Sequence, residues 1–187
     1  MKKLLIALSA LFLGLSMSAQ TGEEILAKIE NSNAKGVSIE HKFTEVRSWA
    51  DNSRKAVTLD GNLVWKDGNL RMDYSNGDKF SIEGAKMTIL RGGKSQVFDL
   101  TKNMMMRNLS NALTLAFHGR MAELANDQKA RILATKEGGD FIVTLSATQK
   151  AARGYNRIEV RYNAKNCRIK SMRMDEFSGL STSYSIE

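Results

Sequence analysis

Apolar and polar residues alternate along the middle of the chain. In segment 61–80 the apolar residues stand at every second position, and they are Leu63, Trp65, Leu70, Met72 and Tyr74. Because successive side chains of a strand point to opposite faces, this spacing predicts strands with one apolar face. Asp67-Gly68 and Asn76-Gly77 interrupt it with residues that tolerate positive φ, as two-residue hairpin loops require. The segment is therefore expected to form an antiparallel meander.

The same two-residue period extends to both sides of this meander. Phe43 and Leu59 carry it before the first turn, Phe80 and Ile82 carry it after the second, and Gly92-Gly93 marks another hairpin. It returns late in the chain with Val143 and Leu145. The predicted strands are 37–44, 57–66, 70–74, 80–82, 86–90, 95–100, 141–145, 158–162, 167–174 and 180–186.

Two segments keep helical spacing instead. Near the start, Ile25 and Ile29 share one side of a short helix, and Thr21 with Glu24 forms a candidate capping box. In the middle of the chain a second helix is expected, with Ser110 as its candidate cap and Gly119 as its stop. The apolar residues of this second helix are Leu109, Ala112, Leu113, Ala116 and Phe117.

Together these elements predict an α+β fold in one domain, residues 20–187. About nine to eleven strands in one antiparallel arrangement predict a strongly curved sheet or an incomplete barrel. Something must fill the hollow side of such a sheet. We hypothesise that a short helix covers the hollow when no ligand is bound and moves aside when a ligand fills it.

The first nineteen residues have the pattern of a secretory signal peptide. Lys2 and Lys3 precede an apolar run from Leu4 to Leu15, and small residues follow up to Ala19, after which cleavage is expected. The run is shorter than the roughly 20 residues of a membrane-spanning helix. With no cysteine near the cleavage site, the mature protein is expected to be exported to the periplasm without a lipid anchor of its own.

Charge and cysteine content exclude several classes of site. The formal net charge of +8 falls to +6 without Lys2 and Lys3, and the remaining basic residues are scattered, which favours a solvated surface over nucleic-acid binding. Cys167 is the only cysteine, so no internal disulfide can form. With only His41 and His118 beside it, no His/Cys zinc cluster is expected. Cys167 is interpreted as a small buried apolar residue.

The chain also lacks the usual motifs of catalysis. It contains no Gly-x-Ser-x-Gly elbow, no Gly-rich phosphate loop followed by Lys-Ser/Thr and no His-Glu-x-x-His. The segment Arg91–Lys94 contains a Gly-Gly pair, but strand patterns on both sides make it a hairpin. Neither an enzyme activity nor a cofactor is therefore expected.

Flexible apolar side chains are abundant. Of ten methionines, eight remain after loss of Met1 and Met17, and Met104, Met105 and Met106 are consecutive. Methionine adapts to irregular partners, although packing in an ordinary core is the more common role of any single one. Each methylene removed from water contributes about 0.8 kcal/mol, so acyl chains bind an apolar hollow without specific polar contacts.

The order of these elements resembles the periplasmic outer-membrane lipoprotein carriers of the LolA-like family. The resemblance covers nearly all of the mature chain and rests on loose motifs: Phe43-Thr-Glu, "GNLVWKDGNLRMDYSN", "ILRGGKSQVFDL" and the closing "MRMDEFSGLSTSYSI". It implies an unclosed antiparallel β-barrel with short helices as a lid or plug. It also implies a monomer without metal that takes lipoproteins by their acyl chains from an inner-membrane release complex to an outer-membrane acceptor.

The expected acyl site combines the resemblance with the alternation pattern. Its predicted lining residues are Phe43, Leu59, Leu63, Trp65, Leu70, Met72, Tyr74, Phe80, Ile82, Leu113, Phe117, Val143 and Leu145. One departure concerns the latch of the lid, because this chain has Asp67-Gly68 where the family commonly has Arg-Pro. Arg71 is nearby but lies on the opposite face by the two-residue period.

Three other classes of protein are alternatives to a carrier. A sensor or regulatory module of this architecture would bind lipidated or misfolded envelope proteins and signal through a partner. A structural envelope protein would have a filled core instead of a hollow. An enzyme would need a constellation of polar residues that the sequence does not display.

Overall fold

The computed structural model describes residues 20–34 and 38–187, so the predicted signal peptide and the first residue of the predicted strand 37–44 lie outside it. The described helices are α1 (Gly22–Asn33), α2 (Met104–Phe117) and α3 (Met121–Asp127). The described strands are β1 (Ile39–Trp49), β2 (Val57–Lys66), β3 (Asn69–Tyr74), β4 (Lys79–Glu83), β5 (Lys86–Arg91), β6 (Lys94–Asp99), β7 (Ala130–Glu137), β8 (Asp140–Ala147), β9 (Tyr155–Asn163), β10 (Ile169–Glu176) and β11 (Leu180–Ile186).

All eleven described strands belong to one antiparallel sheet, in the order β6-β5-β4-β3-β2-β1-β11-β10-β9-β8-β7. Two meanders, β1 to β6 and β7 to β11, join in the middle where β1 pairs with β11. Strands β6 and β7 are the edges, and in the described chain they do not pair with each other. The sheet is therefore an unclosed barrel, and the predicted fold class is confirmed.

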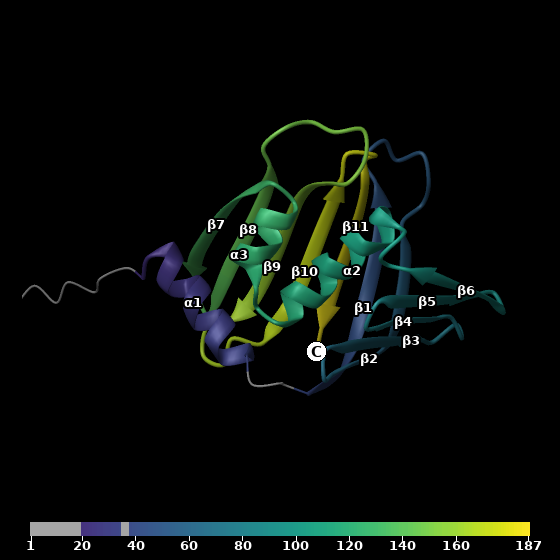
Figure 1. Ribbon diagram of the computed structural model, residues 1–187, viewed down its shortest axis with the longest axis horizontal. Helices are drawn as coiled ribbons and strands as arrows, with labels where there is room; N and C mark the ends of the chain where they lie inside the picture. The colour runs from purple at the N-terminus through teal and green to yellow at the C-terminus, as the bar shows by residue number, and fades with distance from the viewer. Residues whose placement is uncertain (1–19, 35–37) are drawn as a thin grey trace, which may run out of the picture.

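The helices cover one face of this sheet, which we call the inner face (Figure 1). Helices α2 and α3 connect the two edge strands, so the chain crosses the inner face between β6 and β7. Helix α1 packs beside them against β7 and α3. The hydrophobic core lies between the helices and the inner face.

Hairpin chemistry explains the regular meander. Asp67 and Gly68 have φ of 51° and 78°, and Gly92 and Gly93 have φ of 54° and 77°. Positive φ at both central residues is the geometry whose twist matches paired strands. Gly61 has a different role, because a Cβ there would lie 2.3 Å from the carbonyl oxygen of Asp73 and 2.8 Å from the ring of Phe43. The missing side chain leaves room for that ring beside the backbone of β2.

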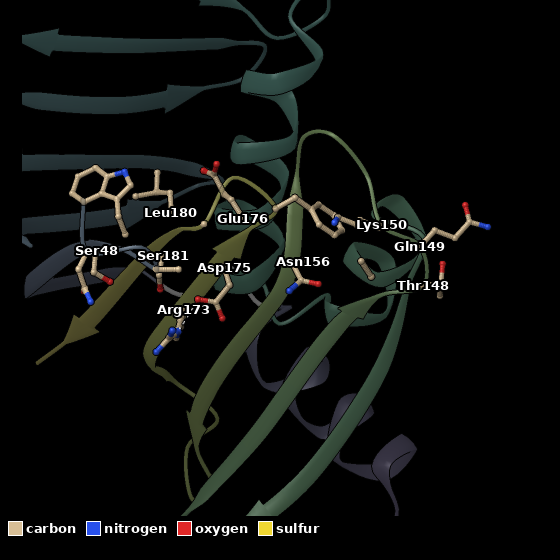
Figure 2. A pocket seen from close by; sticks show the side chains of 16 residues that line it. Ser48, Thr148, Gln149, Lys150, Asn156, Arg173, Asp175, Glu176, Leu180 and Ser181 are labelled. Carbon is tan, nitrogen blue, oxygen red and sulfur yellow. Dashed lines mark hydrogen bonds and ion pairs between the residues drawn. The ribbon is translucent and has the colours of Figure 1, made fainter. Parts of the chain in front are cut away.

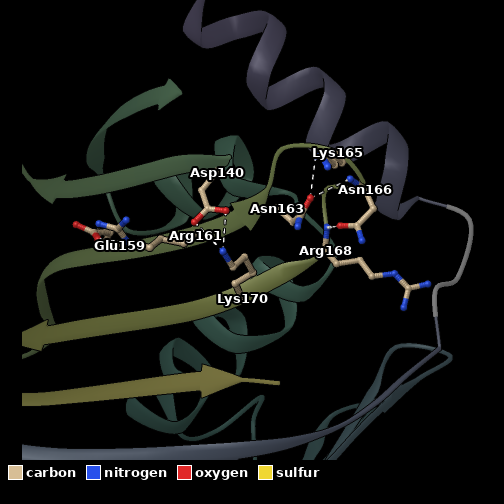
Figure 3. A network of polar contacts seen from close by, with 8 residues as sticks. All are labelled: Asp140, Glu159, Arg161, Asn163, Lys165, Asn166, Arg168 and Lys170. Atoms are coloured by element: carbon tan, nitrogen blue, oxygen red, sulfur yellow. Dashed lines mark hydrogen bonds and ion pairs between the residues drawn. The ribbon is translucent and has the colours of Figure 1, made fainter. Parts of the chain in front are cut away.

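A polar network fixes the turn between β9 and β10 next to α1 (Figure 3). The side-chain oxygen of Asn163 accepts the backbone N–H of Lys165 at 2.9 Å, and that of Asn166 accepts the N–H of Arg168 at 3.0 Å. The turn places Cys167 in the left-handed region, and the buried amide of Asn33 donates to the Cys167 carbonyl at 3.0 Å. The end of α1 is thus attached to the sheet.

Several sequence expectations need correction. The capping box of Thr21 and Glu24 is confirmed, but Ser110 is not a cap: α2 begins six residues earlier, at Met104, with Asn103 as its cap. Strand β7 and helix α3 were not predicted. Cys167 is buried, as expected. In the described residues no helix has the length and apolar character needed to cross a membrane.

Candidate functional site

The predicted acyl-site residues come together on the inner face of the sheet and on α2. Eleven of the thirteen are buried, and the two that remain partly exposed are Leu59 and Tyr74. Their arrangement follows from the two-residue period of the strands, which places residues of β1 to β4 and β8 on one side. The structure therefore brings the predicted residues together on one face, and acyl binding at this face stays a prediction.

Helix α2 fills the space over this surface. Leu109, Leu113 and Phe117 lie four residues apart and form one stripe along the helix. Leu113 and Phe117 line a cavity with Leu63, Met72 and Tyr184, but its volume is only about 10 Å³. A cavity of that volume scarcely holds one water molecule. The space between α2 and the inner face is thus almost completely filled by side chains.

The carboxyl end of α2 is firmly attached. Phe117 stacks on Trp65 with ring centroids 5.6 Å apart, and the ring of His118 lies edge-on to Trp65 at 4.7 Å. The buried hydroxyl of Tyr162 donates to the carbonyl oxygen of Ala116 at 2.7 Å. Burial lowers the pKa of His118, and the positive charge of Arg120 lowers it further. The imidazole is therefore favoured in its neutral form against Trp65.

The amino end of α2 is more open. The side chains of Met104 and Met105 are 68% and 59% exposed, whereas Met106 packs partly against the core. The two ends of the helix thus differ in attachment.

A charged cluster interrupts the apolar inner face on β1. Glu45 is fully buried, accepts the hydroxyl proton of Tyr74 at 2.5 Å and forms an ion pair with Nε of Arg47. Burial raises the pKa of Tyr74, and the charge of Glu45 raises it further, so the phenol stays protonated and donates. The sequence analysis missed this cluster. The signal was available, because Glu45 and Arg47 continue the inner-face period of Phe43.

Next to this cluster is a pocket of about 170 Å³, which we call the mouth pocket. Helix α2 contributes Leu109 to its wall, and the sheet contributes the apolar residues Leu59, Phe80 and Ile89. Tyr184 lines both the mouth pocket and the small cavity under α2. The two spaces are therefore neighbours with one shared wall.

A larger pocket of about 790 Å³ lies at the ends of β1, β10 and β11 (Figure 2). Its lining mixes apolar residues such as Trp49 and Leu180 with polar ones. Among the polar ones, Arg173 and Asp175 form an ion pair and alternate with the buried Met172 and Met174. They therefore lie on the outer face of the sheet. Such a surface does not suit an acyl chain, because binding would desolvate polar groups without replacing their hydrogen bonds.

The carboxylates, histidines and cysteine of the described residues form no group of three arranged to hold a metal ion. The carboxylate pair Asp175 and Glu176 is partly exposed, and the Arg91–Lys94 segment is the hairpin between β5 and β6. Arg71 lies on the outer face, where it pairs with Asp73.

No family model and no curated protein sequence matches the chain. Among solved structures it is similar to a LolA superfamily protein from Nitrosomonas europaea, with 11% identity, 90% of this chain and 92% of the other covered, and a TM-score of 0.40. It is also similar to lipoprotein LppX from Mycobacterium tuberculosis, with 10% identity, coverage of 89% and 95%, and a TM-score of 0.38. LprF from Mycobacterium bovis gives 12% identity, coverage of 89% and 91%, and a TM-score of 0.37. These TM-scores are too low to support an argument about the fold. The fold assignment therefore rests on the strands and helices of this chain itself.

Proposed function

We propose that this protein is an exported periplasmic carrier that binds the acyl chains of lipoproteins between α2 and the inner face of the sheet. In this proposal it takes them from an inner-membrane release complex to an outer-membrane acceptor. The observation that carries the proposal is the large apolar inner face, part of which is covered by the α2 stripe Leu109, Leu113 and Phe117. Export rests on the signal-peptide pattern of residues 1–19.

The energetics favour exchange of the helix for a ligand. Moving α2 away removes side chains such as Leu113 and Phe117 from the core, each worth about 1.5–3 kcal/mol of apolar burial. An acyl chain that buries twelve methylenes contributes about 10 kcal/mol of favourable binding free energy, at about 0.8 kcal/mol for each methylene. Bound and closed states then differ little in free energy, which lets a carrier both accept and release its cargo.

The direction of movement follows from how α2 is attached. Contacts of Phe117 and His118 with Trp65 hold its carboxyl end, while exposed Met104 and Met105 mark its amino end. We infer that the amino end moves first and that the helix swings about residues 118–120, so that full opening separates Phe117 from Trp65. In this chain the Trp65 contacts take the place of the family's Arg-Pro latch, because residues 67 and 68 form a hairpin turn.

Native mass spectrometry of the mature protein, purified from its own periplasm, tests the proposal. Gentle release and identification of the bound material are expected to give a lipoprotein or another acyl compound in stoichiometric amount. A protein that carries nothing and keeps its mass after lipoprotein is added would overturn the carrier function. A stable complex with a membrane protein, without acyl cargo, would favour the sensor alternative instead.

A further inference from the structure

The inner face carries a basic group with unused donors at the edge of the apolar surface. Arg47 extends from β1 into the mouth pocket, and its side chain is 27% exposed. Its Nε donates to Glu45 and its guanidinium also contacts the hydroxyl of Tyr74, so these two contacts use only part of its five donors. A guanidinium has five donors in a planar fork that matches the oxygens of a carboxylate or phosphate.

A second arginine reaches the same pocket from β5. Arg91 shares the inner face with Met87 and Ile89, and its side chain is 66% exposed. Its pairing with Oδ2 of Asp78 is loose, at 3.9 Å, and the same oxygen accepts a hydrogen bond from the Asn76 amide at 3.1 Å.

The charges around the mouth pocket favour an anion. Three cationic side chains line it, namely Arg47, Lys79 and Arg91, and Asp78 is the one carboxylate among its lining residues. Glu45 lies behind Arg47, fully buried, and offsets one of these cations. One positive charge remains in excess at a site that is partly shielded from water, where charge pairs are stronger than in bulk solvent.

The same pocket leads to the space under α2. Leu109 lines the mouth pocket, and Leu113 and Phe117 line the inner cavity on the same stripe. Eight residues of helix separate Leu109 from Phe117, a distance of about 12 Å at about 1.5 Å per residue. An amphiphile with its head group at Arg47 would therefore extend its acyl tail along the path that this stripe now fills.

We propose that the mouth pocket binds the anionic head group of an acyl amphiphile, a carboxylate or a phosphate, through Arg47 and Arg91. This inference rests on the proposed acyl binding under α2 and adds the chemical class of the ligand. A triacylated cysteine has no charge at this point, because its amine is acylated. Fatty acids and phospholipids do carry one, so the site ranks these anionic amphiphiles above neutral acyl groups.

Binding titrations with three probes of equal tail length test the inference. Dodecanoate, dodecyl phosphate and 1-dodecanol are titrated calorimetrically, below micelle formation, into the delipidated mature protein. The two anionic probes are expected to bind at least tenfold more tightly than the alcohol. The tighter of the two identifies the source of the head group, a fatty acid or a phospholipid.

Variants assign the effect to the two arginines. The double variant Glu45→Gln with Arg47→Gln removes both charges of the buried pair, so no unpaired carboxylate is left and the net charge of the pocket is unchanged. It is expected to reduce the preference for anionic probes several-fold, because the guanidinium donors of Arg47 are lost. Arg91→Gln is expected to weaken anionic binding several-fold and to leave the alcohol unaffected. Should the double variant fold poorly, Arg91→Gln decides alone. Arg71→Gln is the matched control, because Arg71 is 64% exposed and ion-paired but lies on the outer face.

The outcomes separate this inference from the proposed function. Equal affinity of the protein for all three probes would overturn the head-group site and leave acyl binding intact. Equal losses for Arg91→Gln and Arg71→Gln would overturn it too. Failure of every probe to bind would overturn both proposals.

Discussion

The indole ring of Trp65 stacks on the ring of Phe117, with centroids 5.6 Å apart and planes 21° from parallel. Trp65 belongs to β2 and Phe117 to the last turn of α2, so this contact joins the sheet to the helix that covers it. Stacked aromatic pairs contribute about 0.5–1.5 kcal/mol beyond their buried area. We infer that the pair holds α2 closed in the absence of a ligand.

Phe117→Ala is expected to destabilise the empty protein and to strengthen acyl binding. The lost ring leaves a cavity in the core, which costs about 3–5 kcal/mol, and the same loss makes displacement of α2 easier. Urea unfolding and titration with dodecanoate measure the two effects. Leu133→Ala on β7, where the side chain is 63% exposed, is the control and should change neither. An affinity that falls together with stability would show that Phe117 binds the ligand instead of closing the site.

Met72→Asp is expected to unfold the protein. Met72 is 1% exposed and the cavity beside it measures only about 10 Å³, so the new carboxylate would be buried without a partner. A large fall in the midpoint of urea unfolding, by circular dichroism, is the expected result. Met105→Asp serves for comparison, because Met105 is 59% exposed and its replacement should leave stability nearly unchanged. A Met72→Asp protein of normal stability would mean that water already fills the hollow.

Gly119→Ala is expected to cost more stability than Gly138→Ala. Both glycines have positive φ, of 71° and 57°, so each substitution carries about 1 kcal/mol of backbone strain. A Cβ at Gly119 would also lie 2.8 Å from Cγ2 and 2.9 Å from the carbonyl oxygen of Ile29, whereas none of the described atoms lies within 4 Å at Gly138. Thermal unfolding of the two variants gives the comparison. Equal losses of stability in the two variants would show that residue 119 does not pack closely against α1.

The stability of the protein is expected to fall as pH drops through the ordinary pKa of histidine, 6.5. Burial lowers the pKa of His118 in the folded state, so below that pH the unfolded chain binds a proton that the folded chain resists. The loss should level off below the folded pKa. Urea midpoints at pH 7.5 and 5.5 measure the effect, and His118→Gln should reduce the difference. An unchanged difference in that variant would assign the pH dependence to other groups.

The sequence predicted most of the sheet, because ten of the described strands have either a clear two-residue period or a Gly-containing hairpin signal. Strand β7 was not predicted, because its large apolar residue Leu133 is exposed while the small Ala134 is buried. The apolar side chains of this strand therefore do not mark its buried face. Helix α2 was placed correctly in its second half. Its first half was missed because it begins with exposed Met104 and Met105, which follow no amphipathic spacing.

The site was predicted only in its apolar part. Leu63, Trp65 and Met72 are identified by alternation alone, since burial follows from the face on which they stand. The pairing of Glu45 with Tyr74, 29 residues apart, depends on how β1, β2 and β3 align, which local patterns do not specify. Closure by α2 is also a tertiary property, because the length of the connection between β6 and β7 does not show where it lies.

A distance measurement between α2 and the sheet tests the central claim that an acyl ligand displaces this helix. Spin labels on Arg107→Cys, at the exposed amino half of α2, and on Arg71→Cys, on the outer face of β3, report the separation, and the buried Cys167 is replaced by Ala. Saturating dodecanoate is expected to lengthen and broaden the distance distribution by several ångströms. An unchanged distribution in a protein that has bound the ligand would contradict the account, because the site would then lie elsewhere than under α2.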